Sequence, residues 1–156
     1  MTIELKEEKT FDTWRLDGRT FNPKKHPHID YLRKQLPPIE EHPIHIRIRG
    51  SIPKASGLGS SAALSVALCG ALQQLRGADL NPMQASELSH RAEANAQGGR
   101  ASPMDTATSS FGGFVVLSDT IEGDLDYLGV RTMDVEGTTL QWHLHTFNAE
   151  IPEGVA

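Results

Sequence analysis

Regular alternation of apolar and polar residues predicts strands early in the chain. In residues 43–50, three isoleucines alternate with a histidine and two arginines, which indicates a strand with one buried face and one wet face. Residues 2–7 alternate in the same way. We expect residues 10–16, which carry Phe11, Trp14 and Leu16, to be their hairpin partner across a link at 7–9.

Apolar residues at helical spacing, bounded by capping and breaking residues, predict three helices. The first starts at His26-Pro27 and ends before the Pro37-Pro38 pair. The second, residues 60–75, is small and apolar enough to be buried, and Gly77 is its expected end. The third starts after the N-cap Asn81, with a proline at its first position, and ends near residue 97.

The rest of the chain is expected to return to strands. Residues 100–113 are predicted as a loop, with or without a short helix, and residues 114–117 as an apolar strand. Residues 125–135 and 138–147 are predicted as two more strands around a Glu-Gly pair. Strands and helices are thus mixed without strict β-α-β alternation, which predicts the α+β class.

Composition narrows the class of protein. With 156 residues and a net charge of −5, the chain is suited to one domain or part of one, and a broad nucleic-acid-binding surface is disfavoured. The single cysteine, Cys69, lies in an apolar run and is expected to be buried and inert. The polar N-terminus and the absence of a long apolar run predict a cytoplasmic protein without a membrane span.

The strongest local signal is a glycine-rich loop, residues 53–59, between a predicted strand and a predicted helix. Its glycines permit close backbone approach to a ligand, and the helix N-terminus that follows favours anions. The loop has neither the Gly-Lys-Ser/Thr ending of a P-loop nor, at Ala62, the third glycine of the dinucleotide fingerprint. Its spacing alone leaves both a phosphate site and a plain helix cap open.

The string from Pro53 to Ala63, Pro-Lys-Ala-Ser-Gly-Leu-Gly-Ser-Ser-Ala-Ala, resembles the second motif of the GHMP kinases at every fixed position. Three further strings resemble mevalonate kinases of the archaeal type: Glu-Ala-Asn-Ala-Gln-Gly at 93–98, Ala-Ser-Pro-Met-Asp-Thr at 101–106 and Phe-Gly-Gly at 111–113. The resemblance implies the two-layer, mixed-sheet N-terminal domain of this family. It also implies ATP and Mg²⁺ as cofactors, and phosphorylation of the 5-hydroxyl of mevalonate in isoprenoid synthesis.

The resemblance also implies a role for each matching residue. Asp105 would be the base that receives the substrate hydroxyl proton, and Glu93 and Ser61 would hold Mg²⁺. Ser102 and Thr106 would lie near the substrate. The residues implied to bind the ATP phosphates are Gly57, Leu58, Gly59, Ser60, Ser61 and Ala62.

Without the resemblance, these residues have ordinary interpretations. Glu93 would be a surface glutamate on a helix, Asp105 would cap a turn, and Ser102 would be a cap or a substrate neighbour. The pairs His26/His28 and His143/His145 could chelate a metal on strands, but no cysteine or carboxylate cluster joins them. The stretch 98–101 also looks one residue longer than in the family.

The family's first motif, with Pro-Gly-Lys and Gly-Glu-His, and its glycine-rich third motif have no counterpart in the sequence. We therefore expect residues 1–156 to be part of the N-terminal ATP-binding domain, without the C-terminal domain, and to have little kinase activity alone. The resemblance leaves a homodimer of the intact enzyme open. The alternatives are another GHMP kinase (acting on phosphomevalonate, homoserine, shikimate or a sugar) or a non-catalytic nucleotide-binding remnant.

Overall fold

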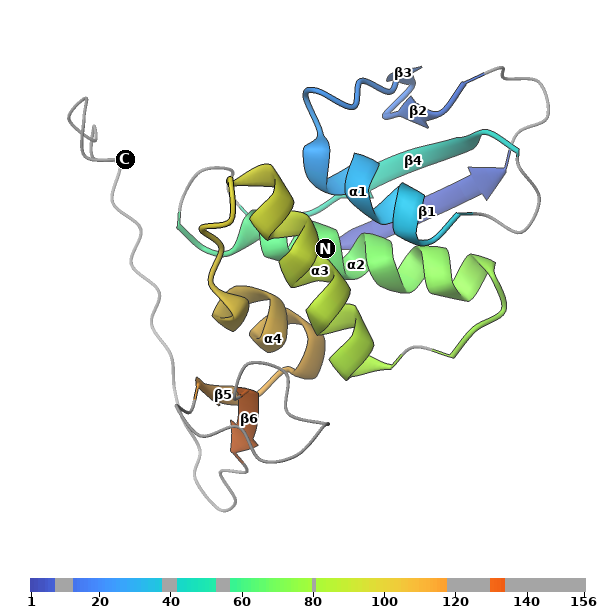
Figure 1. The fold of residues 1–156 in the computed structure, drawn as a ribbon. Coiled ribbons are helices and arrows are strands. Elements are labelled where there is room, and N and C mark those ends of the chain that lie inside the picture. The colour runs from blue at the N-terminus through green and yellow to red at the C-terminus, as the bar shows by residue number, and fades with distance from the viewer. Residues whose placement is uncertain (8–12, 38–41, 53–56, 80, 118–129, 134–156) are drawn as a thin grey trace.

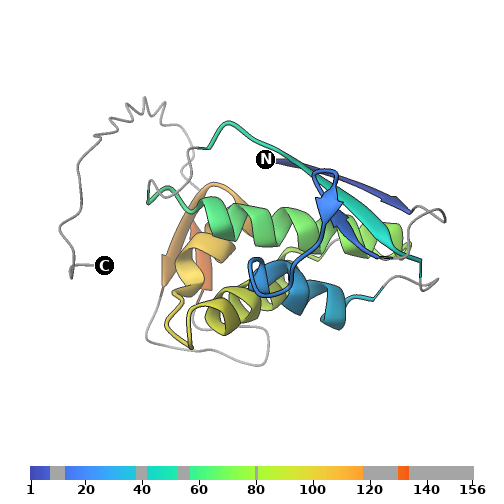
Figure 2. The ribbon, with the colours of Figure 1, turned by 90° about the horizontal axis from the view of Figure 1, so that it is seen from above.

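The computed structural model describes residues 1–7, 13–37, 42–52, 57–79, 81–117 and 130–133. A four-stranded sheet forms one layer, and helices α1, α2 and α3 form a second layer on one of its faces (Figures 1 and 2). The strands are β1 (Thr2–Glu7), β2 (Arg15–Leu16), β3 (Arg19–Thr20), β4 (Ile44–Arg49), β5 (Phe114–Leu117) and β6 (Val130–Met133). The helices are α1 (Pro27–Gln35), α2 (Ser60–Leu75), α3 (Pro82–Ala96) and α4 (Pro103–Phe111). The α+β expectation is confirmed.

The main sheet has the strand order β1-β4-β2-β3, and the expected hairpin of residues 2–7 with 10–16 is wrong. β1 pairs antiparallel with β4 along all of Thr2–Glu7, so that Ile3 lies opposite Ile48 and Leu5 opposite Ile46. β2 pairs parallel with the other edge of β4 and antiparallel with β3. The alternation of apolar residues in β4 is longer than that in β2, and it matches the alternation in β1. β4 therefore lies between β1 and β2 in the sheet.

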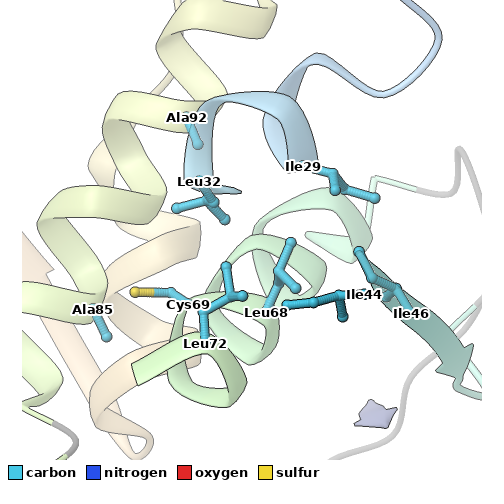
Figure 3. Close-up of a cluster of buried hydrophobic side chains, with 9 residues drawn as sticks. All are labelled: Ile29, Leu32, Ile44, Ile46, Leu68, Cys69, Leu72, Ala85 and Ala92. Atoms are coloured by element: carbon cyan, nitrogen blue, oxygen red, sulfur yellow. The ribbon is translucent and has the colours of Figure 1, made fainter. Parts of the chain in front are cut away.

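The core lies between the sheet and the helices. Ile44 and Ile46 of β4 are fully buried, whereas Arg47 and Arg49 are exposed, as the alternation predicts. Figure 3 shows this cluster, to which α1, α2, α3 and β4 all contribute. Its members are Ile29, Leu32, Ile44, Ile46, Leu68, Cys69, Leu72, Ala85 and Ala92. Burial raises the pKa of the Cys69 thiol to about 11.

Capping residues place the helix ends close to where the sequence predicts them. Asn81 accepts hydrogen bonds from the backbone N–H groups of Met83 and Gln84, at 2.9 and 3.2 Å, and so fixes the start of α3. Gly77, in the left-handed region with φ 67°, follows the end of α2. The start of α3 and the end of α2 therefore lie where Asn81 and Gly77 predict them.

α4 packs against α2 and α3, and the strand pair β5-β6 packs against α4 at one end of the molecule (Figure 1). β5 confirms the strand expected at 114–117, and it pairs antiparallel with β6. β6 falls inside the strand expected at 125–135, while the strand expected at 138–147 and the His143/His145 pair lie outside the described residues. The open prediction for residues 100–113 is resolved as a loop followed by the helix α4.

Candidate functional site

The loop that precedes α2 ends in two glycines with left-handed backbone conformations. Gly57 has φ 69°, and Gly59, the N-cap of α2, has φ 63° and ψ 26°. The first backbone hydrogen bond of α2 runs from the Ala63 N–H to the Gly59 carbonyl, at 2.9 Å. Helix geometry therefore leaves the N–H groups of Ser60, Ser61 and Ala62 without a partner within α2. Since glycine has no side chain to cap them, these donors suit an anion.

Glu93 brings α3 against this helix start. Its side chain is 5% exposed, and its carboxylate accepts hydrogen bonds from the hydroxyls of Ser61 and Ser65, each at 2.7 Å. Gln97, four residues further along, donates to the same carboxylate at 3.1 Å. The Nε2 of His28, on α1, lies 3.7 Å from Oε1. Glu93 is therefore a buried carboxylate held by polar groups, and its interpretation as an ordinary surface glutamate is wrong.

Asp105 also lies next to the loop. It is in the first turn of α4, and its carboxylate lies beside Gly59. A Cβ placed on Gly59 would lie 3.5 Å from Cγ and 3.6 Å from Oδ2 of Asp105. These distances are ordinary contacts, so the exposed carboxylate of Asp105 lies close to residue 59 while leaving room for a small side chain there. The structure thus brings Asp105 to the loop despite the extra length expected at 98–101.

The side chains of Ser102 and Thr106 form hydrogen bonds within the first turn of α4, the helix that carries Asp105. The hydroxyl of Ser102 accepts a hydrogen bond from the Met104 N–H at 3.2 Å, which makes Ser102 the N-cap of α4. Thr106 is fully buried, and its hydroxyl donates to the Pro103 carbonyl at 3.0 Å. Both contacts hold the first turn of α4, where Asp105 lies. The capping interpretation of Ser102 is borne out, and its contact with a substrate stays a prediction.

A cavity of about 350 Å³ opens beside the first turn of α2. Ser60 and Ser61 line it together with Asp17 and His26, and apolar side chains form the rest of its wall. Within the described ranges, no group of three or more histidine, cysteine, aspartate or glutamate residues is arranged to hold a metal ion. His26 and His28, which lie at the start of α1 rather than on a strand, therefore form no such cluster.

The structure brings together the predicted residues Gly59, Ser60, Ser61, Glu93 and Asp105 at one end of α2. Sequence analysis missed the residues that hold Glu93 in place, which are Ser65, Gln97 and His28. The spacing could have suggested two of them, because residues four apart share one face of a helix. Ser65 follows Ser61 by four residues, and Gln97 follows Glu93 by four.

No helix in the described part of the chain combines the length and the apolar character needed to cross a membrane.

The sequence matches the model of a known protein family. A model of the GHMP kinases N terminal domain matches residues 25–113, which include the glycine-rich loop, Glu93 and Asp105.

Individual proteins are also similar in sequence to this chain. The mevalonate kinase of Methanothermobacter thermautotrophicus is 42% identical over 117 residues, which cover 71% of this chain and 38% of that protein. A galactokinase of Thermosipho africanus is 30% identical over 114 residues, or 69% of this chain and 32% of that protein. The chain thus spans well under half the length of these relatives.

A solved structure shares the fold. A crystal structure of mevalonate kinase superposes with a TM-score of 0.66 at 23% sequence identity, covering 86% of this chain and 46% of that one. At this identity the likeness establishes the fold alone. Because the family model matches more than half of the 156 residues, the chain belongs to the GHMP kinase family and has the fold of its N-terminal domain.

Proposed function

We propose that this chain supplies the ATP-binding part of a mevalonate kinase, which transfers the γ-phosphate of ATP to the 5-hydroxyl of mevalonate with Mg²⁺. The observation that carries the proposal is the convergence of two carboxylates on the glycine-rich start of α2. Glu93 accepts a hydrogen bond from Ser61 at 2.7 Å, and Asp105 lies beside Gly59. Phosphoryl transfer depends on aligned phosphates, neutralised charge and an oriented hydroxyl, and this arrangement can provide all three.

The ATP phosphates are assigned to residues 57–62. The left-handed conformations of Gly57 and Gly59 supply the tight turn, and the free N–H groups at the start of α2 supply the donors. The first turn of α2 carries no acidic residue that would repel a phosphate. Leu58 and Ala62 contribute backbone rather than side-chain chemistry in this assignment.

Ser61 and Glu93 fit a magnesium ion. They present a hydroxyl oxygen and a carboxylate, which are the hard oxygen ligands that Mg²⁺ prefers. Magnesium usually takes only one or two carboxylates from the protein and completes its shell with phosphate oxygens and water. The bound ion would neutralise charge on the phosphates, and the two side chains would fix where it lies.

Asp105 is assigned to the acceptor hydroxyl. Its carboxylate is exposed, lies next to the phosphate-binding loop, and is held by a helix start that Ser102 caps. A carboxylate within hydrogen-bond reach of the attacking hydroxyl can orient it and accept its proton. Ser102 would border the acceptor substrate from the same turn, whereas Thr106, which is fully buried, would support that turn from the interior.

Mevalonate is favoured as the acceptor because seven of the similar proteins are named mevalonate kinase. The alternative is another small-molecule kinase of the family, which the similarity to a galactokinase keeps open. Since the chain corresponds to 38% of its archaeal relative, we also propose that these 156 residues alone turn over little substrate. Charge-stabilising groups from the rest of such an enzyme would be lacking, and these usually supply the largest catalytic effect.

The test is a chimera. The 117 matching residues of the Methanothermobacter enzyme are replaced by those of this chain, and the purified protein is assayed with ATP, Mg²⁺ and mevalonate or galactose. Phosphorylation of mevalonate is expected, together with its loss in an Asp105→Asn variant that still binds ATP. A folded chimera that phosphorylates only galactose, or in which Asp105→Asn is fully active, contradicts the proposal.

A further inference from the structure

The carboxylate of Glu93 is held unequally at its two oxygens. Oε1 accepts from Ser65, a fully buried residue in the second turn of α2. Oε2 accepts from Ser61, in the first turn of α2, and from Gln97. Oε1 therefore faces the protein interior. Oε2 lies next to Ser61, which is close to the glycine-rich loop.

We propose that Ser65 is a positioning residue for the metal site: its hydroxyl anchors Oε1 of Glu93 so that Oε2 stays turned toward Ser61 and the phosphate-binding loop. This inference rests on the proposed function of Ser61 and Glu93, which it deepens. Ser65 itself would touch neither the ion nor the nucleotide. It would act by fixing the orientation of the Glu93 carboxylate, which would touch the ion.

The geometry explains why Ser65 can perform this task. Ser61 and Ser65 are four residues apart, so their side chains lie on the same face of α2, one turn above the other. A helical serine often bonds to the backbone carbonyl four residues earlier. The Ser65 hydroxyl instead donates across to α3 at 2.7 Å, within the hydrogen-bonding range of an ionised acceptor.

Burial makes this hydrogen bond consequential. Ser65 is 0% exposed and Glu93 is 4% exposed, so water has little access to replace a lost donor at Oε1. The Nε2 of His28 lies 3.7 Å from Oε1, beyond hydrogen-bonding distance, so it does not replace the Ser65 hydroxyl as a donor. The carboxylate would then rotate toward the donors that remain, Ser61 and Gln97, and Oε2 would lose its fixed position.

Ser86 provides a matched control. It is a serine on a neighbouring helix, α3, and it is also 0% exposed. Its hydroxyl has no hydrogen-bond partner within the described part of the chain. Ser86→Ala and Ser65→Ala therefore remove the same atom from equally buried sites, but only Ser65→Ala removes a bond to Glu93.

The experiment measures Mn²⁺ binding in the presence of ATP by electron paramagnetic resonance, using the 156-residue chain and its two variants. Removing a residue that orients a metal ligand commonly lowers metal affinity by about 10-fold or more, and this loss is expected for Ser65→Ala. Ser86→Ala should leave Mn²⁺ affinity unchanged. ATP binding without metal, measured by calorimetry, should be the same in all three proteins, since Ser65 does not contact the phosphate loop in this account.

The outcomes separate the two proposals. If the parent chain binds Mn²⁺ with ATP and Ser65→Ala binds it equally well, the role of Ser65 is wrong while the proposed function stands. If the parent binds no Mn²⁺ with ATP, both are overturned. Should Ser65→Ala fail to fold, Ser65→Cys keeps the shape but donates only weakly; a Mn²⁺ affinity equal to that of the parent would then refute the inference.

Discussion

The left-handed conformation of Gly59 makes a quantitative prediction for Gly59→Ala. At φ 63° and ψ 26°, an alanine would be placed where its Cβ approaches the backbone carbonyl, at a cost of about 1–2 kcal/mol. The Cβ would meet Asp105 at 3.5 Å, which is ordinary contact and adds no clash. Alanine has less conformational freedom than glycine in the unfolded chain, which offsets this cost by about 0.4–1 kcal/mol. The expected net loss of unfolding free energy is therefore about 1 kcal/mol.

Gly70→Ala is the control, because it makes the same chemical change within the same helix. Gly70 lies in the interior of α2, where glycine is less favourable than alanine by about 0.5–1 kcal/mol. It is half-buried and borders a hollow of about 570 Å³. Gly70→Ala is therefore expected to raise the free energy of unfolding, the opposite sign to Gly59→Ala.

Urea unfolding followed by circular dichroism measures both effects, and thermal unfolding provides a check. For a chain of this length, about 1 kcal/mol corresponds to a shift in Tm of about 2–4 °C. The reasoning is refuted if Gly59→Ala is as stable as the parent, or if both variants lose the same amount. Either result would mean that the backbone at residue 59 does not depend on the left-handed conformation.

Three further predictions concern the scaffold. Asn81→Ala should lower the unfolding free energy by about 1 kcal/mol in urea titrations, because two N–H groups of α3 lose their cap; no loss would contradict the capping role. Burial would raise the pKa of Asp30, but hydrogen bonds from Lys34 and Arg33 outweigh it and lower that pKa, so Asp30→Asn should cost about 0.5–1 kcal/mol at pH 7. This difference should disappear as the pH falls below the ordinary aspartate range, and a difference that persisted at pH 2 would refute its ionic origin. Cys69, whose raised pKa of about 11 keeps it a thiol, should react with a charged disulfide reagent at pH 8 only after urea unfolds the chain.

Local patterns in the sequence were sufficient for most of the elements, but they missed β3 and did not determine how the strands pair. The isoleucine alternation of β4, the Pro-bounded α1 and the Asn81 cap each depend on residues within one or two turns, and each element was predicted close to its observed bounds. The hairpin prediction failed because pairing is non-local. β1 pairs with β4, far along the chain, and the 7–9 link carries no strong turn signal that would bind β1 to its neighbour.

The residues of the candidate site also fall into two groups, those that the sequence identifies and those that only the packing of the helices brings together. The residues that a motif carries (Gly59, Ser61, Glu93 and Asp105) were identified from the sequence, and the fold brings them to one end of α2. Ser65 belongs to no motif that we recognised, and its contact arises only where α2 packs against α3. Spacing places Ser65 on the same face of α2 as Ser61, but only the packing of α2 against α3 brings that face to Glu93.

Calorimetry of ATP binding tests most directly the proposal that Ser61 and Glu93 form a magnesium-dependent ATP site at the start of α2. The parent chain is titrated with ATP with and without Mg²⁺, beside Glu93→Gln, which retains hydrogen-bonding capacity but lacks the charge. The account predicts that Mg²⁺ strengthens ATP binding in the parent and has little effect in Glu93→Gln. Equal strengthening by Mg²⁺ in both proteins would contradict it.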